Sequence, residues 1–204
     1  EVLFEGARTV VLQEKEHTSS KFYVYGKDGV EGVYEHAGKA VNLAESISGI
    51  VMNDAGNYVW QKMSRSAKNQ IMAIQGSQVT EEKDALSICL DTMLAYEGVM
   101  RNSEYMLRSG ETTYSILENS LENTQALDLT GCSLDAVLYY VNKDIPVLVR
   151  LEDGSAVLLI GFNEMNTVIM NPESGTVYKV GMNDSKEWFE QNGNRFVTYI
   201  RNEN

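Results

Sequence analysis

The two cysteines are the side chains of this chain best suited to covalent chemistry. Cys89 and Cys132 could each serve as a thiolate nucleophile, which needs a neighbouring imidazole to act as general base. The only histidines are His17 and His36, so no histidine follows either cysteine in the sequence. A cysteine hydrolase would therefore have to complete its Cys–His pair from the N-terminal part, with His36 as the base.

The sequence around each cysteine favours a structural role. Cys89 lies on a stripe with the spacing of a buried helix face, formed by Leu86, Cys89, Leu90, Met93 and Leu94. Cys132 follows Gly131 just before another predicted helix, where a helix N-terminus could lower the pKa of the thiol. We expect two free, buried thiols, although a disulfide between them stays open if the protein is extracellular.

The sequence gives little support for a metal site, a phosphate-binding loop or a glycosidase site. A metal site needs clustered His, Cys or carboxylate ligands, and none has ligand spacing. No glycine-rich loop leads into a helix with Lys-Ser or Lys-Thr, as phosphate binding would require. With 29 acidic residues, pairs such as Glu81-Glu82 and Glu152-Asp153 are expected by chance and do not indicate a glycosidase. We therefore predict no metal and no cofactor.

The first third of the chain predicts a small β/α unit. Its expected elements are strands at Thr9–Gln13 and Lys21–Tyr25, turns at Gly26–Gly29 and Gly29–Gly32, a helix at Tyr34–Ile47 ended by Gly49, and a hairpin at Gly49–Trp60. A basic stretch at 62–68 marks the junction with the rest. We therefore expect an N-terminal β/α unit at 1–66 and a second domain at 67–204.

The second domain is predicted to be helical first and β-rich afterwards. The expected helices are Thr80–Gly98, Ser103–Arg108, Thr112–Leu121 and Ser133–Val141, with Thr80 as the cap of the first and a short helix at Asp184–Glu190. The expected strands are Pro146–Leu151, Ser155–Phe162, Thr167–Met170, Val177–Val180 and Phe196–Ile200. Tight turns between these strands favour an antiparallel meander, so the fold class is α+β.

Three motifs in this domain carry a family resemblance. They are Gly131-Cys132-Ser133-Leu134 leading to Asp144-Ile145-Pro146-Val147, then Gly154-Ser155-Ala156-Val157 with Gly161-Phe162, and Asn171-Pro172 with Gly175. In this order they resemble the papain-like fold, and within it the bacteriocin-processing, leader-cleaving cysteine peptidases, over residues 70–180. The resemblance implies a papain-like domain behind the small N-terminal unit.

The same resemblance implies that the catalytic residues are missing. The nucleophile position falls on Ala85, the histidine position on Ser155 and the position that orients the histidine on Asn171. The oxyanion glutamine corresponds to Gln78, with Gln75 as a rival. A cap at Thr80 would place Ala85 inside the helix rather than at its tip, whereas moving the register to Cys89 would lose the match at Gly98.

Composition narrows the possible partners. The formal net charge of −12 disfavours nucleic acids and anionic lipid surfaces and favours a basic ligand. The sequence contains no run of eighteen apolar residues, so it predicts no membrane span. Because the chain begins with Glu1, we expect a processed product or a fragment, and the resemblance favours a bacterial surface or secreted context.

These observations lead to three functional hypotheses. The first is a non-enzymatic module that binds a peptide or protein segment, possibly basic, in a degenerate peptidase cleft. The second is an active cysteine hydrolase that uses Cys89 or Cys132 with His36. The third is a structural domain of a larger bacterial surface or secreted protein, whose cleft is filled by side chains.

Overall fold

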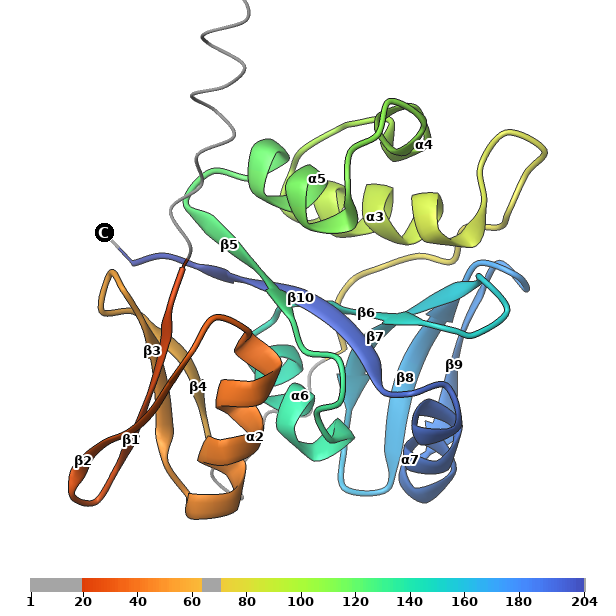
Figure 1. The fold of residues 1–204 in the computed structure, drawn as a ribbon. Helices are drawn as coiled ribbons and strands as arrows, with labels where there is room; N and C mark the ends of the chain where they lie inside the picture. The colour runs from red at the N-terminus through yellow and green to blue at the C-terminus, as the bar shows by residue number, and fades with distance from the viewer. Residues whose placement is uncertain (1–19, 64–70, 204) are drawn as a thin grey trace, which may run out of the picture.

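The fold combines two antiparallel sheets with helices, which confirms the α+β class (Figure 1). The structure is a computed structural model and describes residues 20–63 and 71–203. The predicted strand Thr9–Gln13 and most of the predicted junction at 62–68 lie outside the described residues.

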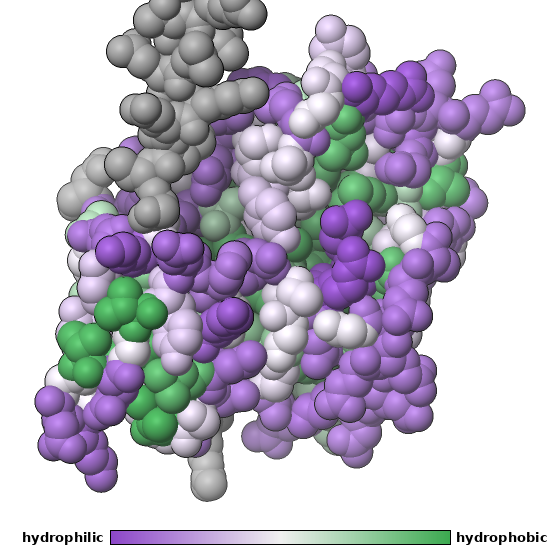
Figure 2. All heavy atoms as spheres, viewed as in Figure 1, coloured by the Kyte–Doolittle hydropathy of each residue, from purple (hydrophilic) through white to green (hydrophobic). Residues whose placement is uncertain are grey.

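The N-terminal unit is a four-stranded sheet with one helix on its inner face. Strands β1 (Phe22–Gly26), β2 (Gly29–Tyr34), β3 (Ile50–Asn53) and β4 (Tyr58–Gln61) lie in the order β2-β1-β3-β4, and helix α2 spans Ala37–Ile47. The buried contact between sheet and helix consists of fully buried apolar residues: Val24, Val51, Val59, Ala40, Val41 and Ala44. Four apolar or aromatic residues of β1, β2 and β4 remain exposed: Tyr25, Val30, Val33 and Tyr58. Figure 2 shows hydrophobic side chains gathered over this sheet, at the lower left.

Three local predictions for this unit were wrong. Tyr34 ends β2, so the helix begins at Ala37, and Gly29–Gly32 lies within β2 rather than in a second turn. The left-handed residue that ends the helix is Ser48, with φ of 53°, and not Gly49. Gly49 is required for another reason, because a Cβ atom there would lie 2.6 Å from the carbonyl oxygen of Tyr25.

The second unit is built on a six-stranded antiparallel sheet in the order β5-β10-β6-β7-β8-β9. Its strands are β5 (Thr124–Asp128), β6 (Val147–Arg150), β7 (Ala156–Phe162), β8 (Asn166–Asn171), β9 (Thr176–Gly181) and β10 (Arg195–Arg201). The successive pairing of β6 to β9 confirms the predicted meander for four of its five strands. The fifth, β10, lies between β5 and β6 instead of beside β9. Sequence analysis missed β5, an edge strand with a single fully buried side chain, Leu127, whose pairing with β10 is visible only in the tertiary structure.

Helices cover both faces of this sheet. Figure 1 shows α3 (Ala85–Tyr96), α4 (Ser103–Arg108) and α5 (Thr113–Ser120) on one side, and α6 (Leu134–Asn142) and α7 (Met182–Gln191) on the other. Helix α3 contacts β6 and β7, while α7 contacts β8 and β9. Every residue of β7 is buried, so this strand lies at the centre of the core.

The predicted start of α3 was also wrong. The Thr80 hydroxyl accepts hydrogen bonds from the backbone N–H groups of Glu82 (3.2 Å) and Lys83 (3.0 Å), which closes a turn before the helix. The cap is Asp84, whose carboxylate accepts from the Ser87 N–H at 2.8 Å. An acidic side chain at this position both satisfies a free N–H and complements the helix dipole.

The two units share one hydrophobic core. The Trp60 indole N–H donates to the Ala136 carbonyl at 3.0 Å, which links β4 to α6. The Ser133 hydroxyl, at the start of α6, donates to the Glu45 carboxylate of α2, with the nearer oxygen at 2.8 Å. The N-terminal sheet is therefore packed against the second unit and bonded to it.

Candidate functional site

Ala85 occupies the tip of α3, where a thiol nucleophile would benefit from the helix dipole. It is the first helical residue and is buried. The favourable place for an anion at this tip is already held by the carboxylate of Asp84, and the Ser87 hydroxyl lies 2.7 Å from the same oxygen. Sequence analysis had placed Ala85 inside the helix, and the structure corrects this because Asp84, not Thr80, is the cap.

The segment before α3 brings Gln78 against the β8–β9 turn. The N–H of Met72 donates to the Ile160 carbonyl, at the point where the β7–β8 register shifts, and the N–H of Val79 donates to the Pro172 carbonyl, both at 3.0 Å. Gln78 itself is exposed, and a Cβ atom added at Gly175 would lie 2.8 Å from its Cβ. Gln78 therefore lies directly beside the turn.

Ser155 stands just before β7 and is bonded to a carboxylate. Its hydroxyl donates to Glu173 Oε1 at 3.1 Å, and its N–H donates to the Asp153 carboxylate at 2.9 Å. Sequence analysis did not identify Glu173 as a partner, although this residue lies in the same Asn171–Gly175 turn. A contact between residues 18 apart in sequence is decided by the register of β7 with β8.

Asn171 shapes the turn that carries Glu173. Its side-chain oxygen accepts from the Glu173 N–H at 3.0 Å, and its amide donates to the Tyr178 hydroxyl at 2.9 Å. These bonds fix the β8–β9 turn, as asparagine side chains commonly do. The Asn171 side chain is thus bonded to the Glu173 backbone and the Tyr178 hydroxyl rather than to an imidazole.

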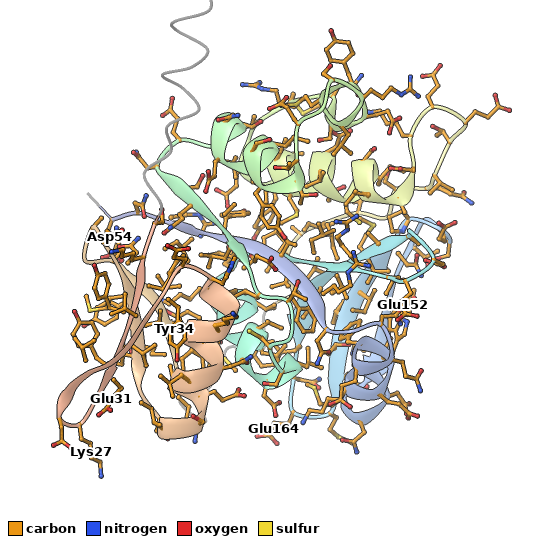
Figure 3. All side chains as sticks on the ribbon, viewed as in Figure 1. Lys27, Glu31, Tyr34, Asp54, Glu152 and Glu164 are labelled. Carbon is orange, nitrogen blue, oxygen red and sulfur yellow. The ribbon has the colours of Figure 1, made fainter. Side chains whose placement is uncertain are left out.

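Three of the four predicted positions therefore meet at one end of the six-stranded sheet, below the N-terminal end of α3 (Figure 1). This end carries the β6–β7 and β8–β9 turns, and Glu152, labelled in Figure 3, marks the first of them. Glu164, also labelled, lies in the β7–β8 turn at the opposite end of β7. Contacts of α3 with β6 and β7 place the fourth position, Ala85, on the element above this end.

Neither cysteine lies free at this end. Cys89 is one turn further along α3 and fully buried, and burial raises the pKa of its thiol far above the usual range. Cys132 is fully buried too, and burial, followed by the charges of Glu45 and Asp128, raises its pKa to about 12. Both thiols are free, as expected, and both are protonated at neutral pH.

His36 lies at the start of α2, the helix against which Cys132 packs, but the Cys132 thiol is bonded to a backbone carbonyl of that helix. His36 precedes α2 as an exposed N-cap residue, and its side chain makes no capping bond. The Cys132 Sγ contacts the carbonyl of Gly38, at 3.5 Å, in the first turn of the same helix. The buried thiol is therefore bonded to backbone.

In residues 20–63 and 71–203 no three His, Cys, Asp or Glu side chains are grouped so that they could hold a metal ion. Within the same residues, no helix has the length and apolar character needed to cross a bilayer.

Comparisons with known proteins identify the fold. No protein-family model matches the sequence, and no curated protein matches it closely enough to count as a relative. Among solved structures, one described as a C39-like peptidase from Bacillus anthracis is similar, with a TM-score of 0.54 and 16% identity over 67% of this chain and 100% of that chain. A double-glycine-motif protease from an AMS/PCAT transporter, in complex with the leader peptide, has a TM-score of 0.46 and 16% identity over 66% of this chain and 94% of that chain.

The first of these similarities shows the fold. The chain has a papain-like fold similar to that of C39-like peptidases over about two thirds of its length, as the sequence motifs implied. Fold alone does not determine activity, which depends on the side chains of the site.

Proposed function

We propose that this chain is a non-enzymatic peptide-binding module on a C39-peptidase-like fold. In this proposal Ala85 and Ser155 stand where the nucleophile and the base would be, and Gln78 and Asn171 are remnants of the same site. The observation that carries it is the hydrogen bond of 3.1 Å from the Ser155 hydroxyl to Glu173. A serine hydroxyl cannot take up a proton near neutral pH as a histidine imidazole can, so Ser155 cannot serve as the general base.

The charge at this end of the sheet supports a basic ligand. The exposed acids at this end of the sheet come from the turn before α3 and from the β6–β7 and β8–β9 turns: Glu81, Glu82, Glu152, Asp153 and Glu173. The nearby Lys83 is already paired with Asp91 at 2.9 Å. An extended basic segment would therefore meet an excess of uncompensated negative charge.

The alternative of a cysteine hydrolase has less support. It would need a thiolate, and burial raises the pKa of both thiols. It would also need His36 to reach a buried sulfur from an exposed position. The third hypothesis, a structural domain with a filled cleft, differs from the proposal by predicting no ligand at this end.

Fluorescence anisotropy with two labelled decapeptides tests the proposal. One peptide alternates Lys with Ala and the other alternates Glu with Ala. We expect the basic peptide to bind, the acidic peptide not to bind, and neither peptide to be cleaved on prolonged incubation. Raising the salt from 0.02 to 0.5 M should weaken binding, because screening acts on exposed charges.

Paired charge variants locate the binding. The double variant Glu152→Gln with Glu173→Gln should weaken binding about 2- to 10-fold, from the loss of two exposed ion pairs. The control, Glu31→Gln with Glu164→Gln, removes the same net charge from the β1–β2 hairpin and the β7–β8 turn (Figure 3). Equal losses in both double variants, or no binding of the basic peptide, would contradict the proposal.

A further inference from the structure

The outer face of the N-terminal sheet is defined by the registers of its four strands. Helix α2 packs on the inner face, where Val24 of β1 and Val51 of β3 are fully buried. Successive side chains of a strand point to opposite faces, so the residues that alternate with these two belong to the outer face. They form two rows across the sheet: Val33, Tyr23, Met52 and Tyr58 in one row, and Val30, Tyr25, Ile50 and Gln61 in the other.

Irregularities in the two edge strands keep these rows on one face. Val30 and Val33 are three residues apart in β2, which in a regular strand would place them on opposite faces. The register with β1 shifts between them, so Val33 pairs with Tyr23 while Val30 pairs with Tyr25. A similar shift in the pairing of β3 with β4 brings both outer residues of β4 onto this face. The outer face is thus continuous over all four strands.

This face is apolar although it faces solvent. All of the eight side chains except Gln61 are apolar or aromatic, and each is at least partly exposed. The most exposed are Tyr58 (54%), Val30 (53%) and Val33 (49%). Hydrophobic side chains gather over this sheet at the lower left of Figure 2. The solvent-facing side of an antiparallel sheet is ordinarily polar, and a contiguous exposed apolar patch marks an interaction surface.

The charges of the chain indicate what kind of partner fits this face. Residues 20–63 carry four lysines and five acidic residues, so the N-terminal unit is nearly neutral. Residues 71–203 carry nine basic and twenty acidic residues, so the second unit is strongly negative. Two copies therefore repel each other when their second units approach, but not when their N-terminal sheets do. A basic partner would be attracted to the second unit instead, which leaves the outer face to a neutral, apolar surface such as its own copy.

The shape of the outer face also suits a second copy. Two sheets can pack face to face about 10 Å apart when the faces that meet are apolar. A two-fold axis supplies such a partner, because it brings the same rows together from each copy. The rim opposes no orientation, since each end of the strands carries both signs of charge: Lys27 with Asp28 at the β1–β2 turn, and Lys21 with Asp54 at the opposite end (Figure 3).

We propose that this chain forms a two-fold symmetric dimer in which the outer faces of the two N-terminal sheets pack together. Each copy contributes both rows, and the α2 helices lie on the outside of the paired sheets. Four strands spaced about 4.8 Å apart and about five residues long cover roughly 300 Å² per copy. A standard interface buries about 800 Å² per partner, so this dimer is weak, with a dissociation constant on the order of 0.1 mM. The proposal is independent of the peptide-binding end of the six-stranded sheet, because the two sites share no residue.

Sedimentation velocity of the full chain from about 0.01 to about 1 mM tests the proposal. We expect a monomer–dimer equilibrium over this range of concentration. Raising the salt from about 0.05 to about 0.5 M should tighten the dimer about 3-fold or more, because salt screens the repulsion between two copies of net charge −12. The same change should weaken binding of a basic peptide at the proposed cleft. The two proposals therefore respond to salt in opposite directions and can fail separately.

A matched pair of variants connects the dimer to the outer face. Val33→Lys should weaken dimerisation at least about 10-fold, because association would bury an unpaired ammonium group. This variant also makes the chain less negative, so weaker association cannot come from greater overall repulsion. The control Val177→Lys makes the same change at an exposed valine of β9 and should leave the dimer unchanged. In dilute protein the two variants should melt at the same temperature, because both valines are exposed in the monomer.

Four results would overturn the proposal. One is a chain that stays monomeric at about 1 mM, and another is a dimer that Val33→Lys leaves intact. A third is a melting temperature of dilute Val33→Lys far below that of Val177→Lys, which would mean that another part of the chain covers the outer face. The fourth is monomer that cosediments with phosphatidylcholine vesicles and loses this binding in Val33→Lys, which would assign the face to a bilayer surface.

Discussion

Cys132 shows how the surroundings of one residue decide its chemistry. It stands next to Ser133, the N-cap of α6, and a helix N-terminus ordinarily favours a thiolate. Burial and the carboxylates of Glu45 and Asp128 act in the opposite direction and raise its pKa to about 12. The same residue type at an exposed helix tip would be a candidate nucleophile, whereas here it packs against the backbone of α2.

This leads to a pH-dependent prediction for thiol labelling. Because the folded pKa of Cys132 is raised above its unfolded value, this thiol stabilises the fold below about pH 8.5 and loses that contribution as the pH rises towards about 12. In the folded protein, iodoacetamide should therefore label Cys89 and Cys132 slowly at pH 7.5 and at pH 9. Both should react fully in 6 M guanidinium, as measured by peptide mass spectrometry. Rapid labelling of one cysteine at pH 7.5 would instead support the hydrolase alternative.

Glu97 connects the end of α3 to β10 at the scale of the elements. Its carboxylate accepts from the buried Tyr199 hydroxyl at 2.6 Å and also binds the Arg201 guanidinium. Tyr96, the last residue of α3, donates to Asp144 at 2.7 Å, so the loop after α6 joins the same network. These bonds hold the C-terminal end of α3 over the sheet.

Removal of this connection should cost measurable stability. Glu97→Leu leaves the Tyr199 hydroxyl buried without an acceptor and should lower the free energy of unfolding by about 1–3 kcal/mol. Glu97→Gln keeps an acceptor and loses only the partly exposed ion pair, so its cost should be about 1 kcal/mol or less. Urea denaturation measures both, and Lys186→Met, which breaks the exposed pair with Asp135, should change stability by only about 0.5 kcal/mol. Equal costs for the two Glu97 variants would assign the effect to the charge pair.

The whole molecule behaves as one packed body in its described part. Residues of both sheets belong to one hydrophobic core, and hydrogen bonds from Trp60 and Asn53 cross the junction to Ala136 and Gln125. The boundary near residue 66 remains a proposal based on composition. A small sheet covered on one face by a single helix has few ways to bury apolar surface alone, so we expect it to depend on the second unit.

The two tryptophans allow a direct test of this dependence. Trp60 lies in β4 of the N-terminal unit and Trp188 in α7 of the second unit, and the chain has no other tryptophan. Trp188→Phe and Trp60→Phe therefore each leave one fluorescent reporter in one unit. When the fluorescence of each variant is compared with its own far-UV circular dichroism, we expect coincident urea midpoints. Separate midpoints within one variant would show two domains that unfold independently.

Much of the fold follows from local patterns in the sequence. The apolar spacing of Leu134, Val137, Leu138 and Val141 predicted α6, and tight turns at Asp153-Gly154 and Ser174-Gly175 predicted the meander. The sequence also determined that no histidine follows His36, which excludes a histidine from the sheet of the second unit. These inferences need only periodicity, turn chemistry and residue identity.

Contacts between distant segments were decided by the tertiary structure. Thr80 was predicted as the cap of α3, whereas Asp84 is the cap. Both residue types can cap a helix, and only the backbone geometry shows which one does. Sequence analysis also missed β5, which depends on pairing with β10, and the Ser155–Glu173 bond, which depends on strand register. A hollow between β4, α6 and β10 is lined by residues as far apart in the sequence as Asn57 and Glu203, so it exists only once both units have packed together. Local residue patterns thus determine where most helices and strands form. The sites between these elements depend on strand register and packing, because they bring together residues that are far apart in the chain.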